Sequence, residues 1–583
     1  MTQQFSGRAT LASWLDAFSR AIASNRTDDV VALFGDLCFW RDLVAFTWDI
    51  RTMEGRDAIR AMLDATLASI RPSAWTVAEP VRPDATDGFV SFETALGRCD
   101  GYVRLDAEGR CLTLLTALRE LKGFEEPTRQ RRVSGRVQRG AGKAAAQATE
   151  SESASQPYVL IVGGGHCGLG LAARLKLLRV PTLIIDSHAR TGDSWRSRYA
   201  SLHLHDPVWW NALPYLDYPD HWPVFPPKDR VGDWLESYAR IMELDIRHNT
   251  ACAGAQYDAT SGQWQVRVVQ DGHETVLRPA HLVLATGLNG DPFIPAIPGA
   301  STFAGEQRHS SAHPGGSRFR GRKVVVFGSN NSAHDICEDL FDHGADVTMI
   351  QRSSTHVIRQ QRVLEMLRPL YSEEALARGL DVGRADLQRA ALPMRMLPVV
   401  FRPMMEKFAQ EDSAFYQRLA AAGFKVDAGP DGTGLVGKAL RKGGGFYIDT
   451  GASELIANGS IKLKSGVEAT RIERDGIVLS DGSRLDADYI VYATGYRPMD
   501  EHIARLVSRE VANSVGPVMG YGSGLEGDSG PWEGELRNLS KPTRQPGLWI
   551  HAGNFQMGRF YSRFLALQLK ARFENLPLDV YRP

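Results

Sequence analysis

Three glycines, Gly163, Gly165 and Gly168, have the G-x-G-x-x-G spacing of a loop that binds a dinucleotide. In such a loop the first glycine permits a tight turn, the second lets the backbone approach a pyrophosphate, and the third lets a helix pack closely on a strand. The helix that follows offers unpaired N–H groups and the positive end of its dipole to the phosphates. Asp186, 23 residues after Gly163, stands where a ribose 2′-hydroxyl needs an acceptor.

The elements that must position these residues occur in the required order. Residues 158–162 form a short apolar run suited to one buried strand, residues 169–178 have a helical pattern, and residues 182–185 form a second strand that ends at Asp186. A glycine-rich turn alone is common. The succession of strand, loop, helix, strand and acid therefore favours a nucleotide site over a turn without a ligand.

A second loop of this kind follows the apolar residues 323–327. Its three glycine positions hold Gly328, Asn330 and Ala333, so only the first glycine is kept, and Ser332 lies within the loop. We expect Asn330 to be accepted in the second position because asparagine tolerates a positive φ better than most residues do. The loop is a weaker match than the first one.

The strand after the second loop ends in Gln351-Arg352 rather than in an acid. An arginine at this point suits a 2′-phosphate, which selects NADPH over NADH. The alternative is that Arg352 is an ordinary surface residue.

Two apolar strands, in residues 281–287 and 487–496, each end in Ala-Thr-Gly, and the second contains Thr494 and Gly495. Two nucleotide loops together with two such strands indicate an α/β fold with two interleaved Rossmann-type dinucleotide-binding domains.

A small α+β domain is expected before them, in residues 1–122. Two helices at the start, a strand, a third helix and three further strands indicate helices packed on a meander. The pattern resembles the cone-shaped fold of nuclear transport factor 2 and SnoaL-type cyclases, which have an open apolar mouth. Trp40, Arg41 and Asp42 either line such a mouth or, as we favour, are ordinary strand residues. We expect this domain to fold independently and to serve assembly or substrate access.

Residues 123–156 contain six basic residues and Ala-, Ser- and Glu-rich runs with almost no large apolar side chain, which is typical of a linker. A contact of the basic cluster with an acidic partner is the alternative to a solvated tether. Residues 353–440 have helical patterns with a methionine cluster, which suits a substrate-lining insert or core packing equally well.

The composition narrows the class of protein. The chain has 583 residues, enough for three or four domains, and its 68 Lys+Arg balance its 68 Asp+Glu, which gives no support for binding to nucleic acid or to anionic membranes. We find no apolar run of membrane-spanning length and no signal peptide. The six cysteines form no C-x-x-C pair, which favours a cytoplasmic location and argues against a disulfide framework or a metal site. The composition does not decide whether the protein forms a homo-oligomer.

Between the two nucleotide loops, Phe303-Ala-Gly-Glu-Gln-Arg-His309 matches the pattern F-x-G-x-x-x-H and is followed by two serines. Further matches are Gly192-Asp-Ser194-Trp195, Leu202-His-Leu-His205-Asp-Pro207, the 222–229 segment, Gly553-Asn554 and residues 559–568. On these motifs, residues 157 to about 575 resemble the flavin-containing monooxygenases, particularly the plant YUCCA type and related microbial enzymes. One departure is His313, which stands where the family pattern ends in an aromatic residue.

The resemblance implies that the first loop holds FAD and the second NADPH. It further implies that the reduced flavin takes up O2 as a C4a-(hydro)peroxide and inserts one oxygen atom into a small organic substrate. The cofactor carries this chemistry, and the protein supplies orientation and a dry pocket. The implied cofactor-binding residues are Gly163, Gly165, Gly168, Asp186, Ser194, Trp195, Gly328, Asn330, Ser332, Arg352, Thr494, Gly495 and Asn554.

With these cofactors the expected organisation has five parts. They are the cone-like domain (1–122), the linker (123–156), the first part of the FAD-binding domain (157–299), the NADPH-binding domain (300–485) with its helical insert (353–440), and the C-terminal part of the FAD-binding domain (486–583).

His205 is the candidate catalytic residue. Family members with an asparagine at this position, two residues before Pro207, use it near the flavin and the nicotinamide. An imidazole can donate a hydrogen bond there and move a proton near neutral pH, and Trp209 and Trp210 would keep the space dry. The alternative is a core histidine bonded to a backbone carbonyl.

Two other functions compete with oxygenation. A flavin disulfide reductase needs a redox cysteine pair near the first loop, where Cys167 is alone. A flavoprotein that acts as an NADPH oxidase, redox sensor or interaction protein would bind both nucleotides and yield only H2O2. The substrate also stays open, since oxo acids and carbonyl compounds suit a nucleophilic flavin peroxide whereas sulfur and nitrogen compounds suit its electrophilic form.

Overall fold

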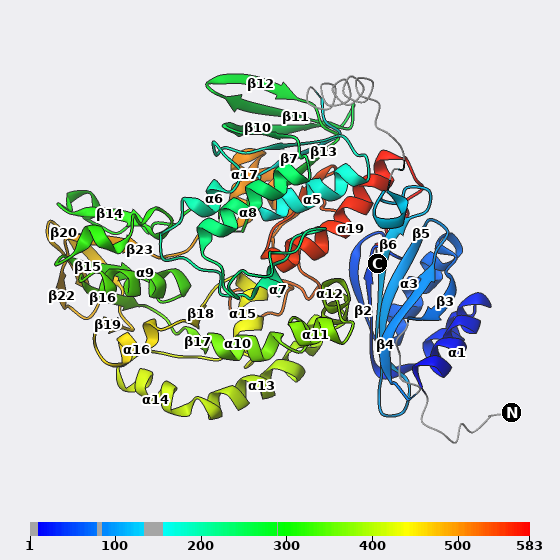
Figure 1. Cartoon of the computed structure of the whole chain (residues 1–583), viewed down its shortest axis with the longest axis horizontal. Coiled ribbons are helices and arrows are strands. Elements are labelled where there is room, and N and C mark those ends of the chain that lie inside the picture. Colours follow the sequence, from blue (N-terminus) through cyan, green and yellow to red (C-terminus); the bar gives the residue numbers. More distant parts are fainter. Residues whose placement is uncertain (1–9, 79–83, 133, 135–155, 289, 583) are drawn as a thin grey trace.

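The computed structural model describes residues 10–78, 84–132, 134, 156–288 and 290–582 (Figure 1). In Figure 1 the N-terminal domain (blue) lies beside α19 (red), a small sheet of β10, β11 and β12 projects at the top, and the helical insert (green to yellow) lies at the bottom. Within the described residues, no helix combines the length and apolarity needed to cross a membrane.

The N-terminal domain is built on one six-stranded sheet in the order β2-β1-β6-β5-β4-β3. The pair of β1 and β6 is parallel, and the other neighbouring pairs are antiparallel. The strands are β1 (Phe34–Leu43), β2 (Ile50–Glu54), β3 (Ser73–Val77), β4 (Asp87–Glu93), β5 (Gly97–Leu105) and β6 (Cys111–Leu121). The helices are α1 (Leu11–Ala23), α2 (Thr27–Ala32) and α3 (Gly55–Ile70). The short strands β2 and β3 are not evident from the sequence pattern, and the resemblance to a cone stays a prediction.

The interior of this domain is filled by aromatic rings rather than open. Ring contacts of 4.0–6.4 Å between centroids connect the buried side chains Trp14, Phe18, Phe34, Trp40, Phe46, Trp75 and Phe92. Trp40 is fully buried and donates its Nε1–H to Thr116 Oγ1 at 2.9 Å. Asp42 is also buried, which raises its pKa to about 6, although it accepts hydrogen bonds from Thr116, Thr47 and Phe46. Trp40 and Asp42 are therefore strand residues of the core, as we favoured.

The first nucleotide loop follows β7, the middle strand of a parallel sheet in the order β24-β13-β7-β8-β9. The strands are β7 (Val159–Val162), β8 (Thr182–Ile185), β9 (Ile246–Arg247), β13 (His281–Leu284) and β24 (Leu548–Ile550). Helices α5 (His166–Leu177), α8 (Lys228–Ile241) and α19 (Phe555–Phe573) pack around it, and α5 lies against α19. The antiparallel strands β10 (Thr250–Asp258), β11 (Gln263–Gln270) and β12 (His273–Leu277) form a separate sheet. The small residues and the bulge between Cys252 and Gly254 hid β10 from the sequence pattern.

The second nucleotide loop lies on another parallel sheet, in the order β14-β23-β15-β16-β19. The strands are β14 (Glu306–His309), β15 (Lys323–Phe327), β16 (Asp346–Gln351), β19 (Lys462–Ser465) and β23 (Tyr489–Tyr492). The predicted α/β fold with two dinucleotide domains is confirmed. One boundary was misplaced, because β23 lies within the expected FAD-binding part 486–583 but pairs with β14 and β15 of the second sheet. The Ala-Thr-Gly ending, which it shares with the end of β13, does not tell the two sheets apart.

The insert is helical, as expected. It contains α10 (Gln360–Leu367), α11 (Glu373–Ala377), α12 (Val382–Ala390), α13 (Leu397–Glu411), α14 (Ser413–Ala421) and α15 (Gly434–Lys442). Strands β17 (His356–Arg359) and β18 (Phe446–Asp449) pair in parallel at its base. Met394 and Met405 are buried in hydrophobic clusters, so core packing accounts for these two methionines.

The linker and the N-terminal domain are joined to the flavin domain by direct contacts. Glu125 of the linker binds Arg98 of the N-terminal domain at 2.7 Å. The next residue, Glu126, accepts from the hydroxyl of Tyr215 in the flavin domain at 2.6 Å. Helix α19 packs on β6, and one apolar core extends from the N-terminal sheet to the flavin sheet. Residues 133 and 135–155, with most of the expected linker, lie outside the described residues.

Candidate functional site

Two glycines of the first loop are required by the packing of the protein itself. Gly163, at the end of β7, has a φ of +112°, and a Cβ there would lie 2.5 Å from the carbonyl oxygen of Ala285. A Cβ on Gly168 would lie 2.0 Å from the carbonyl oxygen of Gly163. These are the tight turn and the close helix–strand packing that the spacing predicts.

Gly165 has a different reason to be glycine. It caps the N-terminus of α5 with an ordinary extended backbone (φ −76°, ψ −179°), and a Cβ there would meet no protein atom within 4 Å. The absent side chain therefore leaves open space directly before the N–H groups of a helix. A pyrophosphate fits such a cradle, so the residues present suit FAD.

Two further features, at the carboxyl ends of the strands beside the first loop, suit a polar ligand. The Thr286 hydroxyl, just beyond β13, is buried and has no hydrogen-bond partner within the described chain. Buried polar groups are rarely left unpaired, and a ligand beside the loop would supply the missing partner of this hydroxyl. Asp186 lies at the end of β8, and its carboxylate accepts hydrogen bonds from Gly164 N at 2.6 Å and from His188 N at 2.8 Å. Burial raises the pKa of Asp186, but these bonds and the His188 ring outweigh it and lower the pKa.

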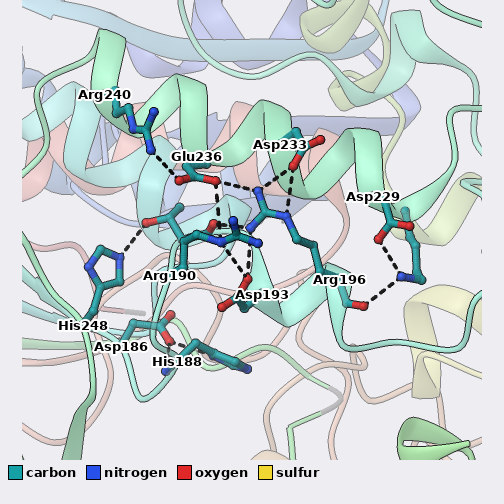
Figure 2. Close-up of polar contacts among 12 residues, drawn as sticks. Asp186, His188, Arg190, Asp193, Arg196, Asp229, Asp233, Glu236, Arg240 and His248 are labelled. Carbon is teal, nitrogen blue, oxygen red and sulfur yellow. Dashed lines mark hydrogen bonds and ion pairs between the residues drawn. The ribbon is translucent and has the colours of Figure 1, made fainter. Parts of the chain in front are cut away.

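The Ser194-Trp195 turn is fixed by a network of ion pairs. Arg196, at the end of the short helix α6 (Asp193–Arg196), reaches toward Asp193, Asp233 and Glu236 at 2.7–3.0 Å (Figure 2). The latter two lie on α8, so α6 is held against that helix. The turn before α6 approaches α8 so closely that a Cβ on Gly192 (φ +90°) would lie 2.2 Å from the Gly232 carbonyl oxygen.

Trp195 connects this turn to the C-terminal flavin segment. Its ring lies 5.5 Å from that of Phe555, which stacks on His166 at 4.2 Å. Asn554 caps α19 by accepting from Met557 N at 2.9 Å. Elements α5, α6 and α19 thus meet at the first loop, and contact of Ser194, Trp195 and Asn554 with FAD stays a prediction.

The second loop is shaped by the same constraint as the first. Gly328 has a φ of +115°, and a Cβ there would lie 2.3 Å from the Ala493 carbonyl oxygen. Asn330 caps α9 (Asn331–Asp342) with a φ of −99°. Our reason for accepting asparagine here was therefore wrong, since the position is extended and demands no positive φ. Ser332 lies in the first turn of α9, at the N-terminal end where a phosphate would bind.

Arg352 follows β16 with an exposed side chain. Among the described residues none forms an ion pair or a side-chain hydrogen bond with it. The neighbouring Gln351 is buried and holds the backbone of Lys425 through two hydrogen bonds. The guanidinium is therefore available for a 2′-phosphate, a role that stays a prediction.

The Ala-Thr-Gly495 end of β23 lies beside the segment around Phe293, and Pro292 forms an antiparallel bridge with Tyr496. Gly495 has a φ of +83°, and its carbonyl oxygen accepts from Phe293 N and from His309 Nε2, both at 2.9 Å. Thr494 donates its hydroxyl to the Phe293 carbonyl oxygen. His309, the last residue of the family fingerprint, thus holds the segment after β23 in place. Burial lowers the pKa of this histidine. Sequence reasoning quoted the fingerprint without finding this role.

His313 still meets the requirement of the aromatic position that it occupies. It is buried, its ring lies 5.9 Å from that of Tyr489 and 6.1 Å from that of Phe319, and its Nδ1 lies 3.2 Å from the Tyr489 hydroxyl. The departure from the family pattern is therefore accommodated.

His205 is half-buried and follows helix α6 of the flavin domain in the chain. It makes no hydrogen bond with any residue that the structure describes, so it is not the core histidine of our alternative. Burial raises the pKa of Asp206 and of Asp335, and attraction to His205 offsets part of that rise, together with the Tyr199 hydrogen bond in the case of Asp335. Asp335 belongs to α9, which places His205 close to the second loop. Trp210, by contrast, is buried against Tyr371 of the insert.

An ion pair missed by sequence reasoning holds the insert to the flavin helix. Asp386 of α12 and Arg559 of α19 are both buried and share two hydrogen bonds of 3.0 Å. Arg559 also donates to the carbonyl oxygens of Trp210 and Ala212. No local pattern indicates this pairing, because the two residues are 173 positions apart.

Comparison with known proteins agrees with this geometry. A family model described as pyridine nucleotide-disulphide oxidoreductase matches residues 160–390. The probable indole-3-pyruvate monooxygenase YUCCA9 of Arabidopsis thaliana is 32% identical over 343 residues, which cover 58% of this chain and 74% of that protein. The indole-3-pyruvate monooxygenase YUCCA1 of Oryza sativa subsp. japonica is 32% identical over 342 residues, 58% of this chain and 77% of that protein.

Two solved structures share the fold. The ε-caprolactone-bound cyclohexanone monooxygenase in its loose conformation aligns with a TM-score of 0.53 at 16% identity, over 72% of this chain and 88% of its own. The complex of OTEMO with FAD and NADP aligns with a TM-score of 0.51 at 17% identity, over 72% and 85%.

Proposed function

Since the chain belongs to the YUCCA-type flavin monooxygenases, we propose that its substrate is a small 2-oxo acid. The protein is an FAD- and NADPH-dependent monooxygenase. Relatives named for indole-3-pyruvate support an oxo acid over a sulfur or nitrogen compound.

The open space at Gly165 is the observation that carries the cofactor assignment. A side chain would fit there without touching the protein, and its absence is explained by a pyrophosphate at the start of α5. When bound, FAD accepts hydride from NADPH and activates O2 for transfer of one oxygen atom. The chain holds FAD with Gly163–Gly168 and Asp186, and it holds NADPH with Gly328, Asn330, Ser332 and Arg352.

Arg389 supports a substrate with a carboxylate. This arginine of α12 lies with its guanidinium carbon 4.6 Å from the centre of the Trp210 ring. No carboxylate among the described residues forms an ion pair with it, although its charge attracts Asp206, the neighbour of His205. Arginine matches a carboxylate through two parallel N–H donors. We assign Arg389 to the carboxylate of the 2-oxo acid.

His205 completes the proposed site. It precedes Asp206 in the chain, interacts electrostatically with Asp335, and makes no hydrogen bond with any residue that the structure describes, so its ring nitrogens are free to serve a ligand. In this role it donates a hydrogen bond into the space between flavin and nicotinamide and moves a proton during oxygen transfer.

The location and partners follow from composition. All six cysteines are unpaired, which supports a reducing compartment, the cytoplasm. The monooxygenase relatives support a small-molecule substrate and O2 as partners, and the balanced charge gives no support for nucleic acid.

The test is an oxygen balance with the purified holoprotein. Indole-3-pyruvate is supplied with NADPH under ¹⁸O2, and the product is analysed by mass spectrometry. The proposal predicts a product that carries one atom of ¹⁸O, and no such product from the corresponding thioether. NADPH oxidation that yields only H2O2 with every oxo acid would refute the assigned substrate class.

A further inference from the structure

Arg41 of the N-terminal domain is buried in a contact with the flavin domain. Its guanidinium pairs with Glu535, in the segment 516–547 before β24, through Nε–Oε1 and Nη2–Oε2 distances of 2.7 Å. The two residues are only 4% and 2% exposed. Thr52, opposite Arg41 on β2, donates to the same carboxylate at 2.6 Å. This is a bidentate ion pair with almost no access to water.

The same side chain contacts two further elements. Arg41 Nη1 donates to the carbonyl oxygen of Ala390, the last residue of α12, at 2.7 Å. Helix-terminal carbonyls lack an intrahelical donor, and a cation there is favoured by the helix dipole. Arg41 Nη2 also lies 3.0 Å from the Tyr561 hydroxyl of α19. One arginine therefore connects the N-terminal sheet, the 516–547 segment, the insert and the flavin helix.

Glu54, at the end of β2, also contacts both the 516–547 segment and the insert. It accepts from Trp532 Nε1 of the 516–547 segment at 2.8 Å. Its other carboxylate oxygen accepts from Arg395, in the insert, at 2.8 and 3.0 Å. The Arg395 guanidinium also lies 4.0 Å from the centre of the Trp532 ring. Two residues of β1 and β2 thus each join the insert to the same segment of the flavin domain.

These contacts act on the elements that carry the proposed site. Ala390 lies one turn beyond Asp386, which pairs with Arg559 of α19. Helix α12 is therefore held at Asp386 by the flavin helix α19 and at Ala390 by the N-terminal domain. It carries Arg389, the proposed carboxylate anchor, and α19 is capped by Asn554, the proposed FAD contact.

We propose that the N-terminal domain is a clamp that fixes α12 on the flavin domain, with Arg41 and Glu54 as positioning residues of the oxygenation reaction. This rests on the proposed function. With the clamp released, α12 moves relative to α19 and the carboxylate anchor loses its alignment with the flavin. NADPH is then still oxidised, but a larger share of the O2 consumed leaves as H2O2 and less product forms.

The variants separate positioning from stability. Arg41→Met alone would leave the Glu535 carboxylate buried without a cationic partner, which is strongly destabilising. The double variant Arg41→Met/Glu535→Met removes both charges and keeps side chains of similar length, but it loses the bonds to Ala390 and Tyr561. Glu54→Gln weakens the second contact at a more exposed site. Arg119→Met, on β6 and away from these contacts, is the matched control, since it breaks a surface pair with Asp100.

Hydrogen exchange of residues 382–390 measures the clamp independently of any substrate, with α8 as an internal reference. In the double variant we expect full FAD content and exchange of α12 faster by about tenfold or more, because a hydrogen bond to a charged group is lost. We also expect a raised KM for the oxo acid, an unchanged KM for NADPH and a larger H2O2 fraction. Glu54→Gln should shift in the same direction, and Arg119→Met should behave as wild type.

Unchanged exchange of α12 together with unchanged H2O2 yield would overturn the clamp. If the double variant does not fold, Glu54→Gln decides the question by the same two readouts. If the wild type oxygenates no oxo acid, the proposed substrate fails while the exchange of α12 still judges the clamp.

Discussion

The Nε2 atom of His309 lies 2.9 Å from the carbonyl oxygen of Gly495 and joins β14 to the segment that leaves β23. On the other side of the ring, Nδ1 accepts from the backbone N–H of Ser311 at 3.2 Å. Nε2 must therefore carry the proton and Nδ1 must not. The ring is neutral in this arrangement, in agreement with the lowered pKa that its burial causes.

This geometry predicts that the stability contributed by the contact of His309 with Gly495 depends on pH. Protonation of Nδ1 would set two N–H groups against each other, so the folded state disfavours the charged ring. Because the pKa is lower in the folded state than the unfolded value of about 6.5, the unfolded state binds more protons below that pH. The stability contributed by His309 is present above pH 6.5 and is lost as the pH falls.

The measurement is the difference in melting temperature between wild type and His309→Asn at several pH values. We expect the variant to be less stable by about 0.5–1.5 kcal/mol at pH 7.5, the contribution of one hydrogen bond. The difference should shrink toward pH 5.5. Other buried histidines cancel in it, so a difference independent of pH would show that His309 does not titrate as described.

The second prediction separates Gly165 from Gly163. Gly165→Ala should fold normally, since the backbone is ordinary and the added Cβ meets no protein atom. It should bind FAD about ten- to a hundredfold more weakly, because charge-assisted phosphate contacts contribute about 1.5–3 kcal/mol. Gly163→Ala should instead lower the melting temperature, because of its positive φ and the contact with Ala285. Titration of the apoprotein with FAD tests both, and full affinity in Gly165→Ala would remove the pyrophosphate from this position.

The glycines of the first loop show how much could be predicted from the sequence. The roles of Gly163 and Gly168 could be predicted because they arise from steric contacts within one strand–loop–helix unit. The argument for Asn330 failed, since spacing does not reveal φ. The pair Arg41–Glu535 could not be predicted at all, because 494 positions separate its members and no periodicity connects them.

The third prediction concerns the choice of nicotinamide cofactor. Arg352→Ala should reduce the preference for NADPH over NADH about ten- to a hundredfold, since one charge-assisted phosphate contact is lost. Arg322→Ala is the matched control, because it removes an exposed arginine at the opposite end of the same sheet. Stopped-flow flavin reduction with both cofactors gives the ratio. If Arg322→Ala changes this ratio and Arg352→Ala does not, the 2′-phosphate binds elsewhere.

The fourth prediction tests the carboxylate anchor. Arg389→Met should raise KM for a 2-oxo acid about tenfold or more, because the charge-assisted pair with the carboxylate is lost. The matching methyl ketone, which lacks the carboxylate, should react with wild type and variant alike. Steady-state kinetics with this substrate pair decides the point, and an equal rise for both substrates would mean that Arg389 supports the fold rather than the substrate.

The last prediction concerns His205. Its ring has no hydrogen-bond partner in the described chain, so replacing it should leave the protein intact: His205→Ala should retain its FAD and its melting temperature. It should be reduced by NADPH at a near-normal rate, because hydride transfer needs no proton from the protein. Product formation should fall about a hundredfold, within the usual contribution of a positioned acid or base, with a matching rise in H2O2.

Two variants make the interpretation of His205 specific. His205→Asn restores a hydrogen-bond donor without a titratable group, so it should recover part of the product yield while losing the pH dependence that an imidazole confers. His203→Ala, two residues away with an exposed side chain, should behave as wild type. Should His205→Ala instead lose flavin or melt early, the residue would be structural. Unchanged product yield with unchanged stability would exclude it from the reaction, and the proton would then have to come from another group near the flavin.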